Sequence, residues 1–254
     1  MASRPRRLVG VQTKMYLSLA QTQAYITSLL AHITRASSLA SQIEIFVLVD
    51  HVSIVPSIAQ QKSTNARLLI GAQDASAQDA GAFTGQVSPA VLAEAGCAVV
   101  MVGHAERRRC GETDALVASK AAAVTRNGMV PLVCFGEDEG GGGVEAAVDV
   151  CRAQVEAVLG GVPDESEVVL AYEPVWAIGA AEPAGEWHVV GVTAAIRGLA
   201  CVKERKGPVR ILYGGSAGPG LFGRVKDGVD GLFMARAGLD VERFWKVVGE
   251  VAEA

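Results

Sequence analysis

No apolar stretch in this chain of 254 residues approaches the roughly 18 to 20 residues that a membrane-spanning helix needs. The basic cluster Arg4-Pro5-Arg6-Arg7 is not followed by the apolar region of a secretory signal. We therefore expect a cytoplasmic protein with no membrane partner.

Cysteine pairs are missing as well. The five cysteines are an odd number and widely spaced, and no two of them form a C-x-x-C motif. This pattern argues against a disulfide framework and against a zinc site. We expect reduced, mostly structural thiols and no metal site.

Positive charge is scattered along the chain after the first residues. The net charge is −4 and the isoelectric point is near 5.6, which argues against nucleic acid as the main partner. Half of the residues are hydrophobic, enough for a large core. Because α/β barrels reach this length as one domain, residues 1–254 are predicted to form a single domain.

Short apolar runs alternate with longer segments that suit helices. The runs predict eight strands: Leu8–Thr13, Ile43–Asp50, Arg67–Ala72, Ala98–Val102, Met129–Phe135, Val168–Tyr172, Val209–Tyr213 and Gly231–Met234. The other segments predict helices: Leu19–Leu39, Ser88–Ala95 with Ser88 as N-cap and Pro89 in the first turn, Thr113–Arg126, Gly143–Leu159, Glu186–Glu204 and Val241–Glu253.

Strands that are apolar without alternation indicate a parallel sheet covered by helices. Eight such units predict an α/β fold of the closed (β/α)₈ type, with eight parallel strands and outer helices. The competing fold is an open doubly wound sheet, but no G-x-G-x-x-G motif follows the first strand. The glycine run 140–143 lacks the Lys-Ser/Thr of a P-loop, so we interpret it as a flexible connection.

The segment Ala171–Gly179 is the most informative part of the sequence. The apolar run Val168–Leu170 leads to Glu173, and Pro174 pushes that glutamate toward extended geometry. Gly179 supplies a flexible end to a short apolar stretch that resembles a closing lid. A carboxylate in apolar surroundings under a lid suits a general base; the alternative is an ordinary loop in which Glu173 caps a neighbouring element.

Polar residues follow most of the predicted strands. In a parallel barrel these positions lie on the face that carries the chemistry, and we expect them to converge: Lys14, Asp50-His51, Gly103–Arg108, Glu137, Glu173, Gly214–Ser216 and Ala235-Arg236. Lys14 suits an anionic substrate, or else is simply solvated. The turn Gly214–Ser216 precedes a short predicted helix, Gly218–Val225, and its N–H groups suit a phosphate, although such turns are common.

Three segments resemble the signature segments of the triosephosphate isomerase family: Val102–Arg108, Ala171–Gly179 and Ile211–Ser216. Gly81–Pro89 and Val133–Glu137 support the resemblance, which spans nearly the whole chain in the family's order. It implies a TIM barrel and an isomerase that acts on a small phosphorylated sugar. It implies neither a metal nor an organic cofactor.

The resemblance also implies catalytic roles for four residues. Glu173 resembles the base that removes a carbon-bound proton, and His104 the neutral histidine that moves protons between two substrate oxygens. Lys14 resembles the lysine that binds substrate and stabilises the enediolate, and Glu106 the carboxylate beside it.

Substrate contacts are implied at Gln12, Gly179, Gly214, Gly215, Ser216, Ala235 and Arg236. Gln12 stands where the family usually has asparagine, and its amide reaches about one ångström further. Ala235-Arg236 stands where the family has two glycines near the phosphate. We expect Arg236 either to turn inward as an extra donor to the phosphate, or else to point to solvent or pair with Asp240 or Glu242.

The substrate implied by default is dihydroxyacetone phosphate, interconverted with glyceraldehyde 3-phosphate through an enediolate. The departures suit a four-carbon ketose phosphate of the erythrulose phosphate type. The third hypothesis is that the chain is a catalytically weak phosphosugar-binding protein. The segment Gln73–Gly85 resembles the family's dimer-interface loop and predicts a homodimer.

Overall fold

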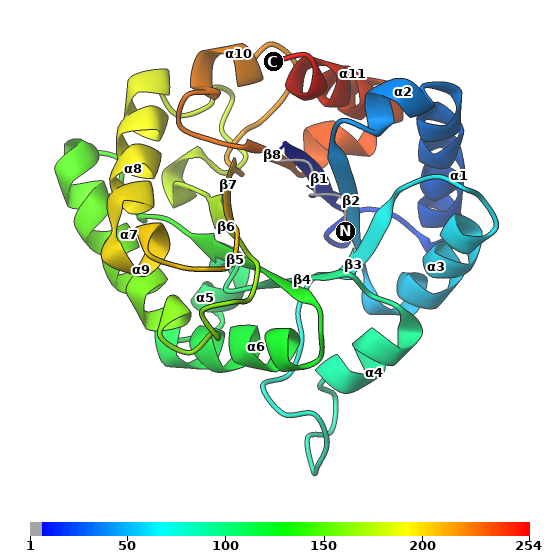
Figure 1. The fold of residues 1–254 in the computed structure, drawn as a ribbon, viewed down its shortest axis with the longest axis horizontal. Coiled ribbons are helices and arrows are strands. Elements are labelled where there is room, and N and C mark those ends of the chain that lie inside the picture. Colours follow the sequence, from blue (N-terminus) through cyan, green and yellow to red (C-terminus); the bar gives the residue numbers. More distant parts are fainter. Residues whose placement is uncertain (1–6) are drawn as a thin grey trace.

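Eight parallel strands close into a barrel in the order in which they occur along the chain (Figure 1). The computed structural model describes residues 7–254, so the basic cluster at residues 4–7 lies outside the described residues except for Arg7. The strands are β1 (Leu8–Gln12), β2 (Glu44–Val49), β3 (Leu69–Ala72), β4 (Val99–Val102), β5 (Val130–Phe135), β6 (Val168–Tyr172), β7 (Val209–Tyr213) and β8 (Gly231–Met234). This arrangement confirms the predicted fold class.

Helices surround the barrel and cover its outer surface (Figure 1). They are α1 (Leu19–Arg35), α2 (Ser37–Ala40), α3 (Ile54–Lys62), α4 (Pro89–Ala95), α5 (Ala105–Arg109), α6 (Asp114–Arg126), α7 (Gly143–Leu159), α8 (Glu186–Gly198), α9 (Ala200–Lys203), α10 (Phe222–Val225) and α11 (Val241–Ala252). Three short 3₁₀ turns are η1 (His51–Ser53), η2 (Val175–Ala177) and η3 (Arg236–Leu239).

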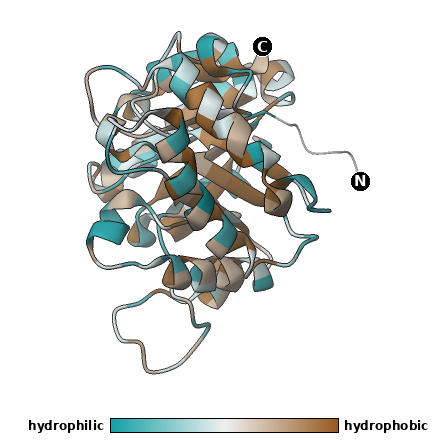
Figure 2. Cartoon of the chain, turned by 90° about the vertical axis from the view of Figure 1, so that its left-hand side faces the viewer, coloured by the Kyte–Doolittle hydropathy of each residue, from teal (hydrophilic) through white to brown (hydrophobic). Residues whose placement is uncertain are grey.

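The strands are continuously apolar because both of their faces are buried. One set of side chains packs between strands and helices, and a second set fills the barrel: Leu8, Phe46, Leu48, Val99, Met101, Leu132, Cys134, Val169, Ala171, Leu212 and Phe233. The rings of Phe46 and Phe233 stack with centroids 5.6 Å apart. A Cβ at Gly10 would lie 1.8 Å from the Phe46 ring, so that ring can occupy the interior only because β1 carries glycine there. Figure 2 shows the apolar strands enclosed by helices of mixed character.

Several predicted helices need correction. Leu19–Leu39 is not one helix, because the backbone leaves helical geometry at Ala36 (φ −114°, ψ 46°) and restarts as α2. Glu186–Glu204 is likewise divided at Leu199, which is extended (φ −61°, ψ 140°). The helix expected over Gly218–Val225 covers only Phe222–Val225.

Two helices were not predicted. The sequence of α3 contains Pro56, and a proline argues against a helix unless it lies in the first turn. The sequence alone does not show where that turn begins, so this helix was missed. The other, α5, is a single five-residue segment that begins directly after His104. The expected start of α4 is confirmed, since Ser88 accepts a hydrogen bond from Val91 N and Pro89 lies in the first turn.

The strands place their carboxyl ends, and therefore the following loops, on one face of the barrel. The loop between β3 and α4 projects away from the barrel, at the bottom of Figures 1 and 2. In the described part of the chain, no helix has the length and apolar character to cross a membrane.

Truncation of the barrel interior should lower stability strongly. Phe46→Ala removes a fully buried ring and leaves a cavity, for which we expect a loss of about 3 to 5 kcal/mol in the free energy of unfolding. Denaturant unfolding measures it, with Val55→Ala, an exposed position on α3, as the control. Equal losses in the two variants would contradict this description of the core.

Candidate active site

Lys14 lies two residues after the end of β1, and its backbone is held in an unusual conformation. Its φ is 47°, the one positive value at a non-glycine residue among residues 7–254. Such a conformation costs about 1 to 3 kcal/mol and persists only where neighbours enforce it. Gln73 Nε2 donates to the Lys14 carbonyl at 3.1 Å, and Lys14 Nζ donates to Glu106 Oε1 at 2.6 Å. The ammonium group is thereby fixed at the mouth of the barrel.

His104 lies two residues after the end of β4 and is the N-cap of α5. Its Nδ1 accepts a hydrogen bond from the Glu106 backbone N–H at 3.1 Å. A nitrogen that accepts carries no proton, so the imidazole is neutral with its proton on Nε2. Nε2–H is therefore the group that His104 presents to the barrel mouth.

Glu173 follows β6 and is buried, with 3% of its surface exposed. Its Oε2 lies 3.5 Å from His104 Nε2, and neither buried atom has a hydrogen-bond partner within the described residues. Buried polar atoms are nearly always paired, so this facing pair indicates a position for a ligand. Burial raises the pKa of the Glu173 carboxyl, opposed only in part by His104, the Cys134 thiol and Lys14.

Small residues make room for the Glu173 side chain. A Cβ at Gly214 would lie 2.6 Å from Glu173 Cγ, and a Cβ at Gly136 would lie 2.1 Å from the Glu173 carbonyl oxygen. The glycine at 214 is therefore required by the carboxylate, independently of any phosphate. A Cβ at Gly215 would lie 2.2 Å from the Tyr213 hydroxyl, so this second glycine also has a packing reason.

Glu106 is half exposed and has the opposite electrostatic behaviour. Partial burial opposes its ionisation, but the hydrogen bond from Lys14 and that lysine's charge outweigh it and lower the pKa of the Glu106 carboxyl. The site thus holds two carboxylates with pKa values displaced in opposite directions. This is the arrangement expected when one carboxylate accepts protons and the other remains a counter-ion.

Residues 175–184, which we call the lid, connect Glu173 to α8. Tyr213 OH accepts from Ala184 N at 2.9 Å, and Ser216 Oγ lies 3.0 and 2.8 Å from the carbonyl oxygens of Ala177 and Ala180. Gly179, within the lid, has φ 73°, which favours glycine. The lid is therefore held over the carboxyl end of β7 at both its beginning and its end.

The turn after β7 presents backbone donors beside the lid. Within residues 7–254, the N–H groups of Gly215 and Ser216 donate to no protein acceptor. Free N–H groups in a turn before a short helix suit an anion. The structure therefore brings the predicted phosphate-contacting turn to the same face as Lys14, His104 and Glu173.

Of the expected arrangements, Arg236 adopts the solvent-facing one, because its side chain is exposed, but it pairs with neither Asp240 nor Glu242. Its guanidinium Nη2 donates to the Tyr16 hydroxyl at 3.0 Å and lies over the Tyr16 ring, 5.1 Å from its centroid. Asp240 instead caps α11, and Glu242 pairs with His32. Arg236 thus links the loop after β8 to the loop after β1 at the exposed rim.

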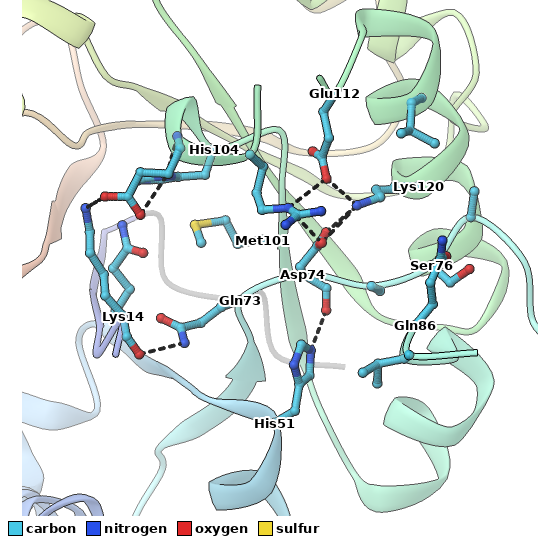
Figure 3. A pocket seen from close by; sticks show the side chains of 18 of the residues that line it. Lys14, His51, Gln73, Asp74, Ser76, Gln86, Met101, His104, Glu112 and Lys120 are labelled. Atoms are coloured by element: carbon cyan, nitrogen blue, oxygen red, sulfur yellow. Dashed lines mark hydrogen bonds and ion pairs between the residues drawn. The ribbon is translucent and has the colours of Figure 1, made fainter. Parts of the chain in front are cut away.

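A polar cavity of about 470 Å³ adjoins the site (Figure 3). Gln12, Lys14 and His104 line one side of it, and the start of the projecting loop lines the other. Lys120 bonds both Asp74 and Glu112 there and so fastens the base of the loop to the barrel. In residues 7–254 no group of three or more His, Cys, Asp or Glu is placed to hold a metal ion.

Three residues near the site were not singled out by the sequence. Cys134 contacts Glu173 from inside the barrel, Tyr213 holds the end of the lid, and Tyr16 binds Arg236. A signal existed for two of them, because Tyr213 ends an apolar strand and Tyr16 closely follows Lys14. Nothing in the sequence indicates that Tyr16 meets a residue 220 positions away.

Comparison with known proteins gives a consistent result. The family model described as triosephosphate isomerase matches residues 7–251. The chain is 40% identical, over 256 aligned positions, to a Pectobacterium atrosepticum protein named L-erythrulose-1-phosphate isomerase, with 98% of this chain and 97% of that protein covered. It is 42% identical over 212 positions to a Mycobacteroides abscessus protein named triosephosphate isomerase, with 76% of this chain and 80% of that protein covered.

The raised pKa of Glu173 predicts a pH-dependent effect of its removal. Because the folded-state pKa exceeds the unfolded one, the associated stability is fully present below the unfolded pKa and is lost as pH rises through the folded pKa. Glu173→Gln should therefore raise Tm more at about pH 8 than at about pH 4. The control Glu106→Gln should show the opposite trend, since that pKa is lowered. Parallel trends in the two variants would contradict the assignment.

Proposed function

The chain belongs to the triosephosphate isomerase family, whose members are intramolecular oxidoreductases, and we propose that it isomerises a small ketose phosphate through an enediolate. The observation that carries the proposal is the facing pair of unpartnered atoms, Glu173 Oε2 and His104 Nε2. Enolisation requires a general base at the carbon that loses its proton and a proton donor at the adjacent carbonyl oxygen.

The proposed reaction consists of two balanced pairs of proton transfers. Glu173 removes a proton from the carbon beside the carbonyl, the C–H electron pair forms the C=C bond, and the carbonyl oxygen receives a proton from His104 Nε2. The hydroxyl of the neighbouring carbon returns its proton to the histidine while Glu173 delivers a proton to the former carbonyl carbon. The Lys14 ammonium stabilises the negative charge in between, an effect worth about 10²- to 10³-fold in rate for one well-placed donor.

We propose that the phosphate lies at the turn after β7, under the lid. The free N–H groups of Gly215 and Ser216 support this position, with Gly179, Gly214 and Ala235 around it. The lid then serves to exclude water from the enediolate.

Three observations favour a four-carbon ketose phosphate over a triose phosphate as the preferred substrate. Such a substrate carries an extra hydroxymethyl group, and Arg236 with Tyr16 places additional hydrogen-bonding groups at the rim. Gln12 sets a longer amide beside Lys14. The Pectobacterium relative named for erythrulose 1-phosphate also aligns along almost the full chain.

Substrate choice is tested by measuring kcat/KM with L-erythrulose 1-phosphate and with dihydroxyacetone phosphate. We expect the four-carbon substrate to be preferred, and Arg236→Gly to reduce that preference about ten-fold by loss of a charged donor. Clearly superior turnover of the triose phosphate would overturn the substrate assignment. Incubation with either ketose in heavy water tests the reaction itself, because a binding protein incorporates no deuterium and Glu173→Gln abolishes incorporation by an isomerase.

We also propose that the chain forms a homodimer through the loop Gln73–Gly85. The loop projects from the barrel (Figure 1), and Phe83, which belongs to this loop, is 42% exposed. The polar cavity beside Lys14 contains two buried oxygens without partners in the described residues, Gln73 Oε1 and Glu112 Oε2. In a symmetric dimer, the loop of each subunit fills the cavity of its partner. Such a dimer accounts both for the exposed Phe83 and for the two oxygens without partners.

Light scattering at micromolar concentration tests the dimer. Phe83→Asp should shift the mass to that of a monomer, because a charge in a buried contact remains unpaired. Val91→Asp, an exposed position on α4, is the control. A monomeric parent chain would refute the proposal.

A further inference from the structure

A second polar cluster lies behind the lid, centred on the carboxylate of Glu137. This side chain follows β5 and is 4% exposed. Its oxygens accept from Trp176 Nε1 at 2.8 Å and from Tyr172 OH at 3.1 Å, and His188 Nε2 lies 3.1 Å away. One buried carboxylate thus gathers these three side chains from three separate elements around the lid, and Cys151 Sγ of α7 donates to its Oε2 at 3.8 Å.

These three partners surround the lid and the proposed base in the sequence. Tyr172 directly precedes Glu173, and Trp176 lies in η2 at the start of the lid. His188 lies in the first turn of α8, just after the lid ends. The Glu137 backbone carbonyl also accepts from Val175 N at 2.9 Å. Both ends of the lid are therefore tied to the same residue.

The hydrogen-bond pattern assigns the role of His188. Its Nε2 lies within 3.1 Å of both Glu137 Oε1 and Tyr172 OH. Burial, with the negative charge of Glu137, raises the pKa of Tyr172 well above its usual value, so the phenol remains a donor to the carboxylate. An Nε2 without a proton would direct its lone pair at the carboxylate. His188 is therefore a donor to Glu137.

The surroundings of the imidazole couple it to the lid. The Trp176 ring meets it edge-on with centroids 5.7 Å apart, and Trp187 does so from the other direction at 5.8 Å. Within residues 7–254, His188 is the basic side chain that lies within 4 Å of the Glu137 carboxylate. Without this donor, the carboxylate loses one of the hydrogen bonds that keep it directed at Trp176.

We propose that His188 is a positioning residue of the lid. By donating to Glu137, it keeps that carboxylate directed at Trp176 and Tyr172, and so fixes the resting position of the lid over the phosphate turn. The proposal rests on the proposed function, since it assigns the lid to a phosphorylated substrate.

A matched pair of variants tests the donor. His188→Gln keeps an N–H group able to reach Glu137, whereas His188→Leu has similar bulk and no donor. We expect His188→Leu to raise KM for the ketose phosphate about ten-fold with kcat changed less than three-fold, because a smaller fraction of molecules holds the lid correctly. We expect His188→Gln to stay within about two-fold of the parent. Equal KM values in the two variants, whether raised or unchanged, would overturn the proposal.

A double-mutant cycle tests whether His188 acts through the Trp176 contact. Trp176→Phe removes the indole donor without altering α8, and should by itself raise KM. In the double variant with His188→Leu, the KM rise should be that of the larger single change, because the two act on one contact. Additive rises in the logarithm of KM would contradict this route. If His188→Leu fails to fold, an unchanged KM in Trp176→Phe overturns the proposal.

Failure of this proposal is distinguishable from failure of the proposed function. Deuterium incorporation by the parent chain and its loss in Glu173→Gln report on the reaction alone. The His188 series reports on KM, and thermal unfolding of each variant separates loss of lid position from loss of stability. A purely structural role lowers Tm without the difference in KM between Gln and Leu.

Discussion

The site depends on keeping one ionisable carboxylate, that of Glu173, buried at the mouth of the barrel. Burial disfavours its charged form and raises its pKa, so the folded chain carries an electrostatic cost at this position. As a result, few substitutions are compatible with the positions that surround the Glu173 carboxylate. Gly136 and Gly214 leave it space, Cys134 contacts it from below, and His104 faces it with an unpaired N–H. The rigid strands beneath these residues make such an arrangement tenable.

The strands were predictable because burial on both faces leaves a continuous apolar run in the sequence. The helices were less predictable, because their boundaries depend on local backbone conformations that composition does not reveal. Ala36 and Leu199 interrupt two helices although neither is glycine or proline. The short α5 owes its position to the cap that His104 supplies, and therefore to the site more than to its own propensity.

The residues expected to converge do so because parallel strands fix where each strand ends. Side-chain direction on the loops was not predictable in the same way. Arg236 turns toward Tyr16, a contact between opposite ends of the chain, whereas the nearby Asp240 caps α11 and Glu242 pairs with His32. His188 is similar: only the packing of α8 against the lid brings it to Glu137. Such contacts depend on the assembled barrel and leave no local pattern.

Burial also separates the residues to which we assign the chemistry from those to which we assign substrate selection. Glu173 and His104 are almost fully buried, so a substitution there that leaves a buried polar group unpaired costs about 1 to 3 kcal/mol in the free energy of unfolding. Arg236 and Tyr16 are exposed, where most substitutions change stability by about 0.5 kcal/mol or less. A barrel of this kind can therefore change its exposed rim without disturbing the buried residues beneath it. For the proposed enolisation, an unchanged buried pair combined with an altered rim is the outcome that this difference in cost favours.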